Sequence, residues 1–240
     1  MTIAPPIFHP GQNDLIAAFN GKEWSLIADH LELVGLPLGE VLYEPGITMR
    51  YVYFPISAII SLLYVMEDGY SAEIAVVGKE GLLGIPLLLG GESTSSRAVV
   101  QSGGYGFRIK AELLKNEFNR CGVIHDVLLR YTQALMTQMT QTAACNRHHS
   151  LEQQLCRWLL LSLDRLPTNK LLMTQELIAS MLGVRRAGVT EVAGKLQRAG
   201  LIKYRRGHIE VTDRDGLETK VCECYAVVKK EYDRLLPASG

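Results

Sequence analysis

The chain has 240 residues, 48% of them hydrophobic and 21% charged, and its 25 basic and 25 acidic residues give a net charge of zero. This length allows two modest domains, and the composition is ordinary for a soluble globular protein. The N-terminus lacks the pattern of a signal peptide, and the most apolar stretch, residues 51–66, is too short to span a membrane. Five cysteines without regular spacing suit a reducing compartment, so we expect a cytoplasmic protein.

The first half of the chain predicts two short helices followed by a β-rich domain. After a proline-rich segment over residues 1–12, Asn13 or Asp14 can cap a helix, and a second helix is expected over residues 23–33. From residue 36 to about 108, short β-prone runs alternate with glycines, which is typical of a small β-barrel or sandwich. Asp68-Gly69 is a strong signal for a hairpin turn within this region.

A long helix without proline is expected from Gly122 to Cys145, after a short helix that begins at Lys110. Its spacings of three and four residues define a heptad-like stripe, which favours a subunit interface. The alternative is a helix that packs on the β-rich domain of its own chain. The stripe consists of Ile124, Leu128, Tyr131, Leu135, Gln138, Thr142 and Cys145.

Residues 171–211 predict a helix-turn-helix followed by a β-hairpin, after a helix that Ser150 can cap. Thr174 can cap the first helix of this segment, and Gly183 permits a tight turn. The second helix is expected from Arg186 to Ala199, before a hairpin that turns at residues 205–207. Two helices joined by a glycine turn, with a wing behind them, place the second helix in the major groove of DNA.

Positive charge is concentrated in the same segment, where seven Lys or Arg and one acid, Glu191, lie between Gly183 and Gly207. Such an excess suits contact with phosphates, although charge alone also fits a solvated basic face. The residues expected to reach base edges are Arg185, Arg186, Ala187, Thr190 and Glu191. Those expected to contact phosphates are Lys203, Arg205, Arg206 and His208.

The segment TQELIASMLGVRRAGVTEVAGKLQRAGLI, with LEQQLCRWLLLSLDRL before it and YRRGHIEVTDRDGLE after it, resembles the DNA-binding domain of the Crp/Fnr regulators. The motifs VYFP, SLL, DG and VGKEGLLG are similar to that family's cyclic-nucleotide-binding-type β-barrel. The resemblance implies an α+β fold and a homodimeric transcription regulator that binds a palindromic operator in double-stranded DNA and works with RNA polymerase. The implied domains are a sensor barrel at 13–115, a dimerisation helix at 116–145, a winged helix-turn-helix at 146–216 and a helical extension at 217–240.

By position, the resemblance makes Arg186 the guanine-reading arginine of the family. Ala187 and Glu191 occupy the other two base-reading positions, where the best-known member has a glutamate and an arginine. The DNA sequence that is read should therefore differ. Three further residues fall where the family usually contacts phosphate: Thr174, Gln175 and Gly188.

The family's nucleotide cassette uses a glutamate for the ribose hydroxyl and an Arg-Ser pair for the cyclic phosphate. Here Leu82 stands at the glutamate position, and Arg97 comes one place later than the family arginine. Cyclic AMP is therefore not expected as an effector, and a different ligand or none remains open. Arg97 either meets an anion or is a surface arginine. The candidate pocket residues are Gly81, Leu82, Gly84, Ser96 and Arg97.

No cofactor, metal site or catalytic residue is expected. The β-rich region has no histidine between Leu31 and Ile124 and no cysteine before Cys121, which argues against haem, an iron–sulfur cluster or a cupin-like metalloenzyme. The alternatives to a regulator are a catalytic or protein-binding barrel with an accessory helix-turn-helix. Cys222 and Cys224 are expected to pack a C-terminal helix, and His148 and His149 to lie in a solvated hinge loop, with metal, redox or pH roles as alternatives.

Overall fold

The computed structural model describes residues 8–19 and 21–236, so residues 1–7 of the proline-rich segment lie outside the description. The Asn13 side chain caps the first α-helix as predicted, because its oxygen accepts hydrogen bonds from the backbone N–H groups of Leu15 and Ile16, at 3.1 Å each. The second helix ends at Ala28, earlier than predicted. The first elements are η1 (Pro10–Gln12), α1 (Asp14–Ala18) and α2 (Gly21–Ala28).

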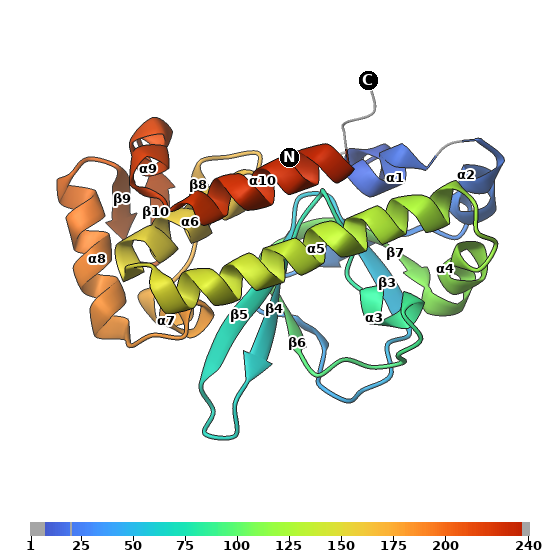
Figure 1. Cartoon of the computed structure of the whole chain (residues 1–240), viewed down its shortest axis with the longest axis horizontal. Helices are drawn as coiled ribbons and strands as arrows, with labels where there is room; N and C mark the ends of the chain where they lie inside the picture. The colour runs from blue at the N-terminus through green and yellow to red at the C-terminus, as the bar shows by residue number, and fades with distance from the viewer. Residues whose placement is uncertain (1–7, 20, 237–240) are drawn as a thin grey trace, which may run out of the picture.

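Two antiparallel sheets form the β-rich domain (Figure 1). Most of their buried apolar side chains belong to the main hydrophobic core. The predicted hairpin is confirmed, because β4 and β5 pair on either side of Asp68-Gly69, where Gly69 has a φ of 84°. One sheet has the order β1 (Glu32–Leu36), β7 (Gly104–Lys110), β3 (Tyr51–Pro55). The other has the order β2 (Val41–Tyr43), β6 (Arg97–Ser102), β4 (Ile59–Val65), β5 (Ser71–Val77), and α3 (Ile85–Leu88) lies between β5 and β6 in the chain.

The long helix α5 (Val123–His148) follows α4 (Ala111–Phe118) and runs across the β-rich domain (Figure 1). All seven residues of the heptad-like stripe are buried within the chain itself. They pack toward the sheets and toward α10 (Glu223–Leu235), so the stripe follows the alternative of intrachain packing. The polar residue Gln138 in this stripe pairs with the backbone of the edge strand β5. Its side-chain amide accepts a hydrogen bond from Val76 N and donates one to Val76 O, at 3.1 Å each.

The C-terminal part contains the predicted helix-turn-helix and wing. Ser150 caps α6 (Leu151–Leu163) as predicted, because its side chain accepts a hydrogen bond from Gln153 N. An additional short strand, β8, pairs with the wing. The elements are α6 (Leu151–Leu163), β8 (Lys170–Leu172), α7 (Gln175–Leu182), α8 (Arg186–Arg198), β9 (Ile202–Arg205), β10 (His208–Val211) and α9 (Arg214–Lys220).

The C-terminal part packs directly on the β-rich domain. Ser71 Oγ in β5 donates to the carbonyl oxygen of Ser180 in α7, at 3.3 Å. Gln101 Nε2 in β6 donates to Ser162 Oγ in α6, at 3.1 Å, and both residues are buried. Within the described residues, no helix combines the length and hydrophobicity that crossing a membrane requires.

Candidate nucleic-acid interface and effector pocket

The turn between α7 and α8 is built from two local signals in the sequence. Thr174 Oγ1 accepts a hydrogen bond from Leu177 N at 3.2 Å and so caps α7. Gly183 ends α7 with a φ of 65°, a left-handed conformation that favours glycine. Apolar side chains then fix the orientation of α8, because one face is buried against the domain: Val189, Val192, Ala193 and Leu196.

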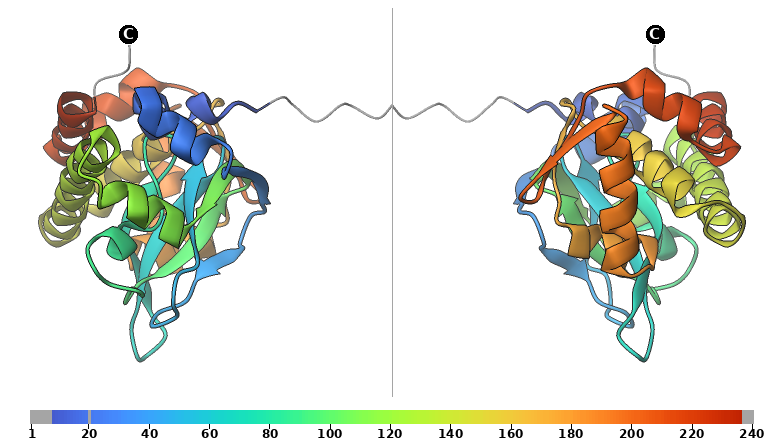
Figure 2. Two further views of the ribbon diagram at one scale, coloured as in Figure 1. Left: turned by 90° about the vertical axis from the view of Figure 1, so that its right-hand side faces the viewer. Right: turned by 90° about the vertical axis from the view of Figure 1, so that its left-hand side faces the viewer.

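The opposite face of α8 is exposed at its N-terminal end, and α8 lies across one end of the molecule (Figure 2). Thr190 Oγ1 lies 2.7 Å from Gln175 Oε1, to which it donates, and this contact ties the start of α7 to α8. Arg186 Nε lies 3.9 Å from Glu176 Oε2, a loose contact between two exposed side chains. The five predicted base-contacting residues share this surface: Arg185, Arg186, Ala187, Thr190 and Glu191.

Glu191 forms an ion pair with Lys195 one turn further along α8, at 2.8 Å. The hydrogen bond from Lys195 holds the pKa of the Glu191 carboxyl below its usual range. Glu191 is therefore ionised at neutral pH, and it keeps free lone pairs that could accept a hydrogen bond from cytosine N4.

The wing is a tight hairpin whose turn residues Arg206 and Gly207 both have positive φ, at 47° and 82°. Gly207 O accepts a hydrogen bond from Met173 N at 2.6 Å, which holds the wing beside the start of α7. The predicted phosphate-contacting side chains of the wing are all exposed: Lys203, Arg205, Arg206 and His208. Thr174 is exposed and Gln175 partly exposed next to them.

Gly188 serves a packing role in the structure. A Cβ atom at this position would lie 2.9 Å from Leu151 Cδ2, so a larger residue would require the end of the Leu151 side chain to move. Its place at the family's phosphate-contacting position thus coincides with a close contact between helices.

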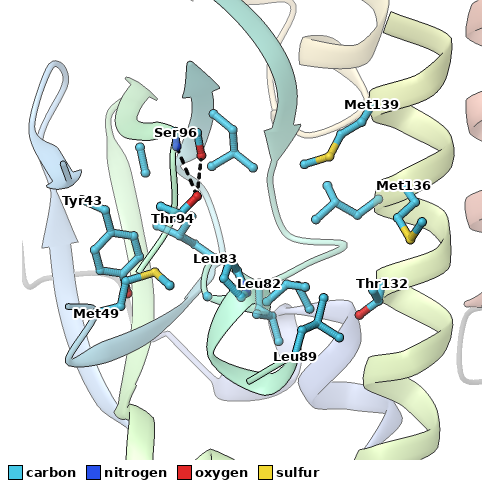
Figure 3. A pocket seen from close by; sticks show the side chains of 16 residues that line it. Tyr43, Met49, Leu82, Leu83, Leu89, Thr94, Ser96, Thr132, Met136 and Met139 are labelled. Atoms are coloured by element: carbon cyan, nitrogen blue, oxygen red, sulfur yellow. Dashed lines mark hydrogen bonds between the residues drawn. The ribbon is translucent and has the colours of Figure 1, made fainter. Parts of the chain in front are cut away.

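A pocket of about 200 Å³ lies between the β-rich domain, α3 and α5 (Figure 3). Of the predicted pocket residues, Leu82, Gly84 and Ser96 line it. Ser96 Oγ and Thr94 Oγ1 lie 3.0 Å apart, so they satisfy each other. None of the described residues that line the pocket has a charged side chain, and most are Leu, Met, Ile or Ala.

Gly81 and Arg97 do not line this pocket. Gly81 allows Tyr131 to pack against the backbone, since a Cβ atom there would lie 2.5 Å from Tyr131 Oη. Arg97 Nε lies 2.9 Å from Glu44 Oε2, and both side chains are substantially exposed. Arg97 is therefore a surface arginine with an acidic partner, the second of the two alternatives considered for it.

The sequence suggested metal roles for His149, Cys222 and Cys224 only as alternatives, and it did not predict that these residues meet Cys145. Cys145 and His149 at the end of α5 lie beside Cys222 and Cys224 at the start of α10, with all four potential ligand atoms within 4.8 Å of one another. Cys145 and His149 are four residues apart and thus lie on one helix face, and this spacing is the only part of the cluster that the local sequence indicates. Cys222 and Cys224 are far from these two residues in the sequence, so their proximity could not be inferred from it.

Comparisons with known proteins agree with this architecture. The family model of the Crp-like helix-turn-helix domain matches residues 153–220. FixK2 from Bradyrhizobium japonicum has a TM-score of 0.69 at 16% identity, with 80% of this chain and 98% of that chain covered. A Crp/Fnr-family regulator from Eubacterium rectale gives 0.67 at 19% identity, with 88% and 97% covered. TTHA1359, a Crp/Fnr-family regulator from Thermus thermophilus, gives 0.61 at 23% identity, with 78% and 97% covered.

A comparison with curated proteins finds no match. Residues 153–220 form a Crp-like helix-turn-helix domain, and the chain has the fold of the Crp/Fnr-type transcription regulators. The resemblance stated from the sequence and the fold class derived from it are thereby confirmed.

Proposed function

We propose that the protein is a cytoplasmic homodimeric regulator that reads a palindromic operator through α8 and acts on transcription by RNA polymerase. One observation carries this proposal: the N-terminal face of α8 and the basic wing expose their polar side chains on one part of the surface while the apolar face of α8 is buried. Arginine at the helix start can donate two hydrogen bonds to guanine O6 and N7. The wing cations would hold the phosphate backbone.

In this proposal residues 13–115 form the sensor domain, 116–145 the dimerisation helix, 146–216 the DNA-binding domain and 217–240 the helical extension. The base-reading residues are Arg185, Arg186, Ala187, Thr190 and Glu191. The phosphate-contacting residues are Thr174, Gln175, Lys203, Arg205, Arg206 and His208.

The dimer interface that we propose is the outer face of α5, because the inner stripe is already covered by the chain. Leu129 and Met136 are exposed to 43% and 60%, although both are large and apolar. With Ala143 they repeat every seven residues, and Thr132 and Met139 fall between them at the other seam position of a heptad. An exposed heptad seam on a long helix is the surface that a parallel helix of a second copy would cover.

The pocket beside α5 is proposed as the effector site, and its chemistry argues against a cyclic nucleotide. A cyclic phosphate needs a cation, and a ribose hydroxyl is best bound by a carboxylate, but neither group lines this pocket. Leu82, Leu83 and Met49 present hydrocarbon and thioether surface instead (Figure 3). An uncharged, largely apolar molecule is the ligand class that this lining would accommodate.

Selection of bound sequences from a random DNA pool tests the proposal. Two α8 helices related by a two-fold axis should select half-sites about one helical turn, or ~34 Å, apart. Enrichment of a single asymmetric motif would rule out the symmetric dimer, and enrichment of nothing would rule out sequence-specific binding. Size-exclusion chromatography with light scattering on the same protein measures the oligomeric state independently.

A further inference from the structure

The hinge between α5 and α6 contains a compact set of metal-binding side chains. Cys145 is buried in the last turn of α5, and His149 is the residue that caps this helix. Cys222 caps the start of α10 and Cys224 lies in its first turn, both buried. Their thiol sulfurs and one imidazole nitrogen all lie within 4.8 Å of one another.

Two distances between the ligand atoms are close to those of a tetrahedral zinc site. Zn–S bonds of about 2.3 Å and Zn–N bonds of about 2.0 Å put neighbouring ligand atoms of a tetrahedron roughly 3.5–3.8 Å apart. Cys145 Sγ and Cys222 Sγ are 3.5 Å apart, and Cys224 Sγ and His149 Nδ1 are 3.6 Å apart. Ligand atoms this close surround one ion, whereas an iron–sulfur cluster of several metal atoms holds its thiolates farther apart.

The other nitrogen of the imidazole ring also has a suitable partner. His149 Nε2 lies 3.3 Å from a carboxylate oxygen of Glu223, the residue between the two C-terminal cysteines. A histidine that binds zinc through one nitrogen usually donates its other N–H to a carboxylate or carbonyl oxygen, which fixes the ring and its tautomer. This arrangement leaves His149 Nδ1 free for a metal.

The charge of the surroundings supports the same assignment. Three thiolates, a neutral imidazole and Zn²⁺ carry a net charge of −1. The guanidinium of Arg157 lies near Cys145, is only 4% exposed, and donates to Thr142 Oγ1 at 3.0 Å. Its Nε has no hydrogen-bond partner among the described residues. A buried cation is stabilised by a nearby anion, and the anionic zinc–thiolate centre would be one.

We propose that Cys145, His149, Cys222 and Cys224 bind one Zn²⁺ ion that joins the end of α5 to the start of α10. Four protein ligands leave no open coordination position, so the site is structural and not catalytic. Cys145 and His149 precede the helix-turn-helix, α7 and α8, in the chain, and Cys222 and Cys224 follow it. The ion therefore cross-links the two ends of the segment that contains the helix-turn-helix, and it fixes this segment to α5.

The metal content of the full-length protein, purified with reductant and without oxygen, tests the proposal. We expect elemental mass spectrometry to find about one zinc ion per chain. After substitution with cobalt(II), the absorption spectrum should show the intense ligand-field bands of a tetrahedral site and a thiolate-to-cobalt charge-transfer band. Cys224→Ser should lose the charge-transfer intensity of one thiolate and bind the metal more weakly. Cys121→Ser, which changes an exposed cysteine, and Cys156→Ser, which changes a buried one outside the cluster, are the matched controls.

Glu223→Gln tests the supporting contact, because loss of such a partner usually weakens metal binding by about 10- to 100-fold. The proposal is overturned if wild-type protein fails to bind a stoichiometric metal after reconstitution, or if its cobalt form lacks thiolate bands. It is also overturned if Cys224→Ser binds metal as well as Cys121→Ser does. A Cys145–Cys222 disulfide in the anaerobically purified protein would show a redox pair in place of the ion. The wild-type cobalt spectrum alone shows whether thiolates bind the metal in a tetrahedral site, so this part of the test stands even if a variant fails to fold.

Discussion

Ser61 Oγ lies 2.5 Å from Glu73 Oε2 and 2.7 Å from Gln101 Oε1, so one hydroxyl group faces two oxygen acceptors. A hydroxyl has one hydrogen to donate. The amide nitrogen of Gln101 already donates to Ser162 Oγ, which fixes its oxygen toward Ser61. All contacts are satisfied when Glu73 is protonated and donates to Ser61, which then donates to Gln101. Burial raises the pKa of Glu73 to about 7.

The stability of the protein should therefore depend on the protonation of Glu73. The folded-state pKa of about 7 exceeds the ordinary value of 4.5, so the folded protein binds more protons between these values. Stability from this group is fully present below the lower value and is lost as pH rises through the upper one, by up to about 3 kcal/mol. Urea denaturation across this pH range should show a shallower pH dependence for Glu73→Gln. Glu67→Gln, an exposed change on the same hairpin, is the control and should keep the wild-type slope.

The two arginines at the proposed DNA surface should behave differently on substitution. Arg186→Ala should cost roughly 1–3 kcal/mol of operator binding and relax the preference at one base pair of each half-site. Arg206→Ala should weaken binding to all sequences alike and reduce the salt dependence of log K by about 1 per wing. Binding assays with operator and unrelated DNA at several salt concentrations separate these effects. A uniform loss in both variants would make Arg186 a phosphate contact.

Charge on the outer face of α5 should separate the subunits. Met136→Glu places a carboxylate in the exposed seam, and we expect a folded monomer with much weaker operator binding. Thr137→Glu introduces the same charge about a quarter turn away and should remain dimeric. Light scattering with circular dichroism measures both association and folding. A dimeric Met136→Glu protein would place the interface elsewhere.

A glutamate at position 128, on the inner face of the same helix, should have a different effect. The Leu128 side chain is 0% exposed within the chain, so Leu128→Glu should unfold or strongly destabilise the protein instead of producing a folded monomer. Thermal unfolding followed by circular dichroism checks this expectation. A cooperatively folded Leu128→Glu protein of normal stability would contradict the packing described for α5.

Cyclic AMP and cyclic GMP should not bind the pocket at micromolar concentrations. Each charged hydrogen-bond partner that is missing costs on the order of 1.5–3 kcal/mol, or about ten- to a hundredfold in affinity. Calorimetric titration should show no binding heat, and operator binding should be unchanged by either nucleotide. Arg97→Ala should leave both results as they are, because Arg97 is paired with Glu44 outside the pocket. Micromolar binding with tighter operator affinity would refute this assignment.

Local signals in the sequence predicted the local structure well. Asn13, Ser150 and Thr174 begin helices because their side chains accept backbone N–H hydrogen bonds, and Asp68-Gly69 turns a hairpin. The direction of the α5 stripe could not be predicted, because the same spacing suits a sheet of the same chain and a helix of another. Gln138 illustrates this ambiguity, since a polar seam residue and a residue that caps a strand edge look alike in sequence.

The site residues were predictable to the extent that they depend on one segment. The exposed face of α8 follows from its apolar periodicity, whereas the pairing of Glu191 with Lys195 follows from their spacing along a helix. The neighbours of Cys145 were not predictable, because packing of α10 along α5 brings Cys222 and Cys224 to it from the far side of the DNA-binding domain. The role of Arg97 was ambiguous for the same reason, because its partner Glu44 directly follows β2 and is far from Arg97 in the sequence.

Met136 and Met139 contribute to the wall of the pocket and also lie on the outer side of α5. A ligand in the pocket and a second copy of the chain would thus touch the same two flexible thioether side chains. The free energy of ligand binding would then depend on whether the partner is present, and the strength of association would depend equally on the ligand. Ligand binding in this small apolar pocket would then change how the two subunits pack, and no separate hinge between the pocket and the interface would be needed.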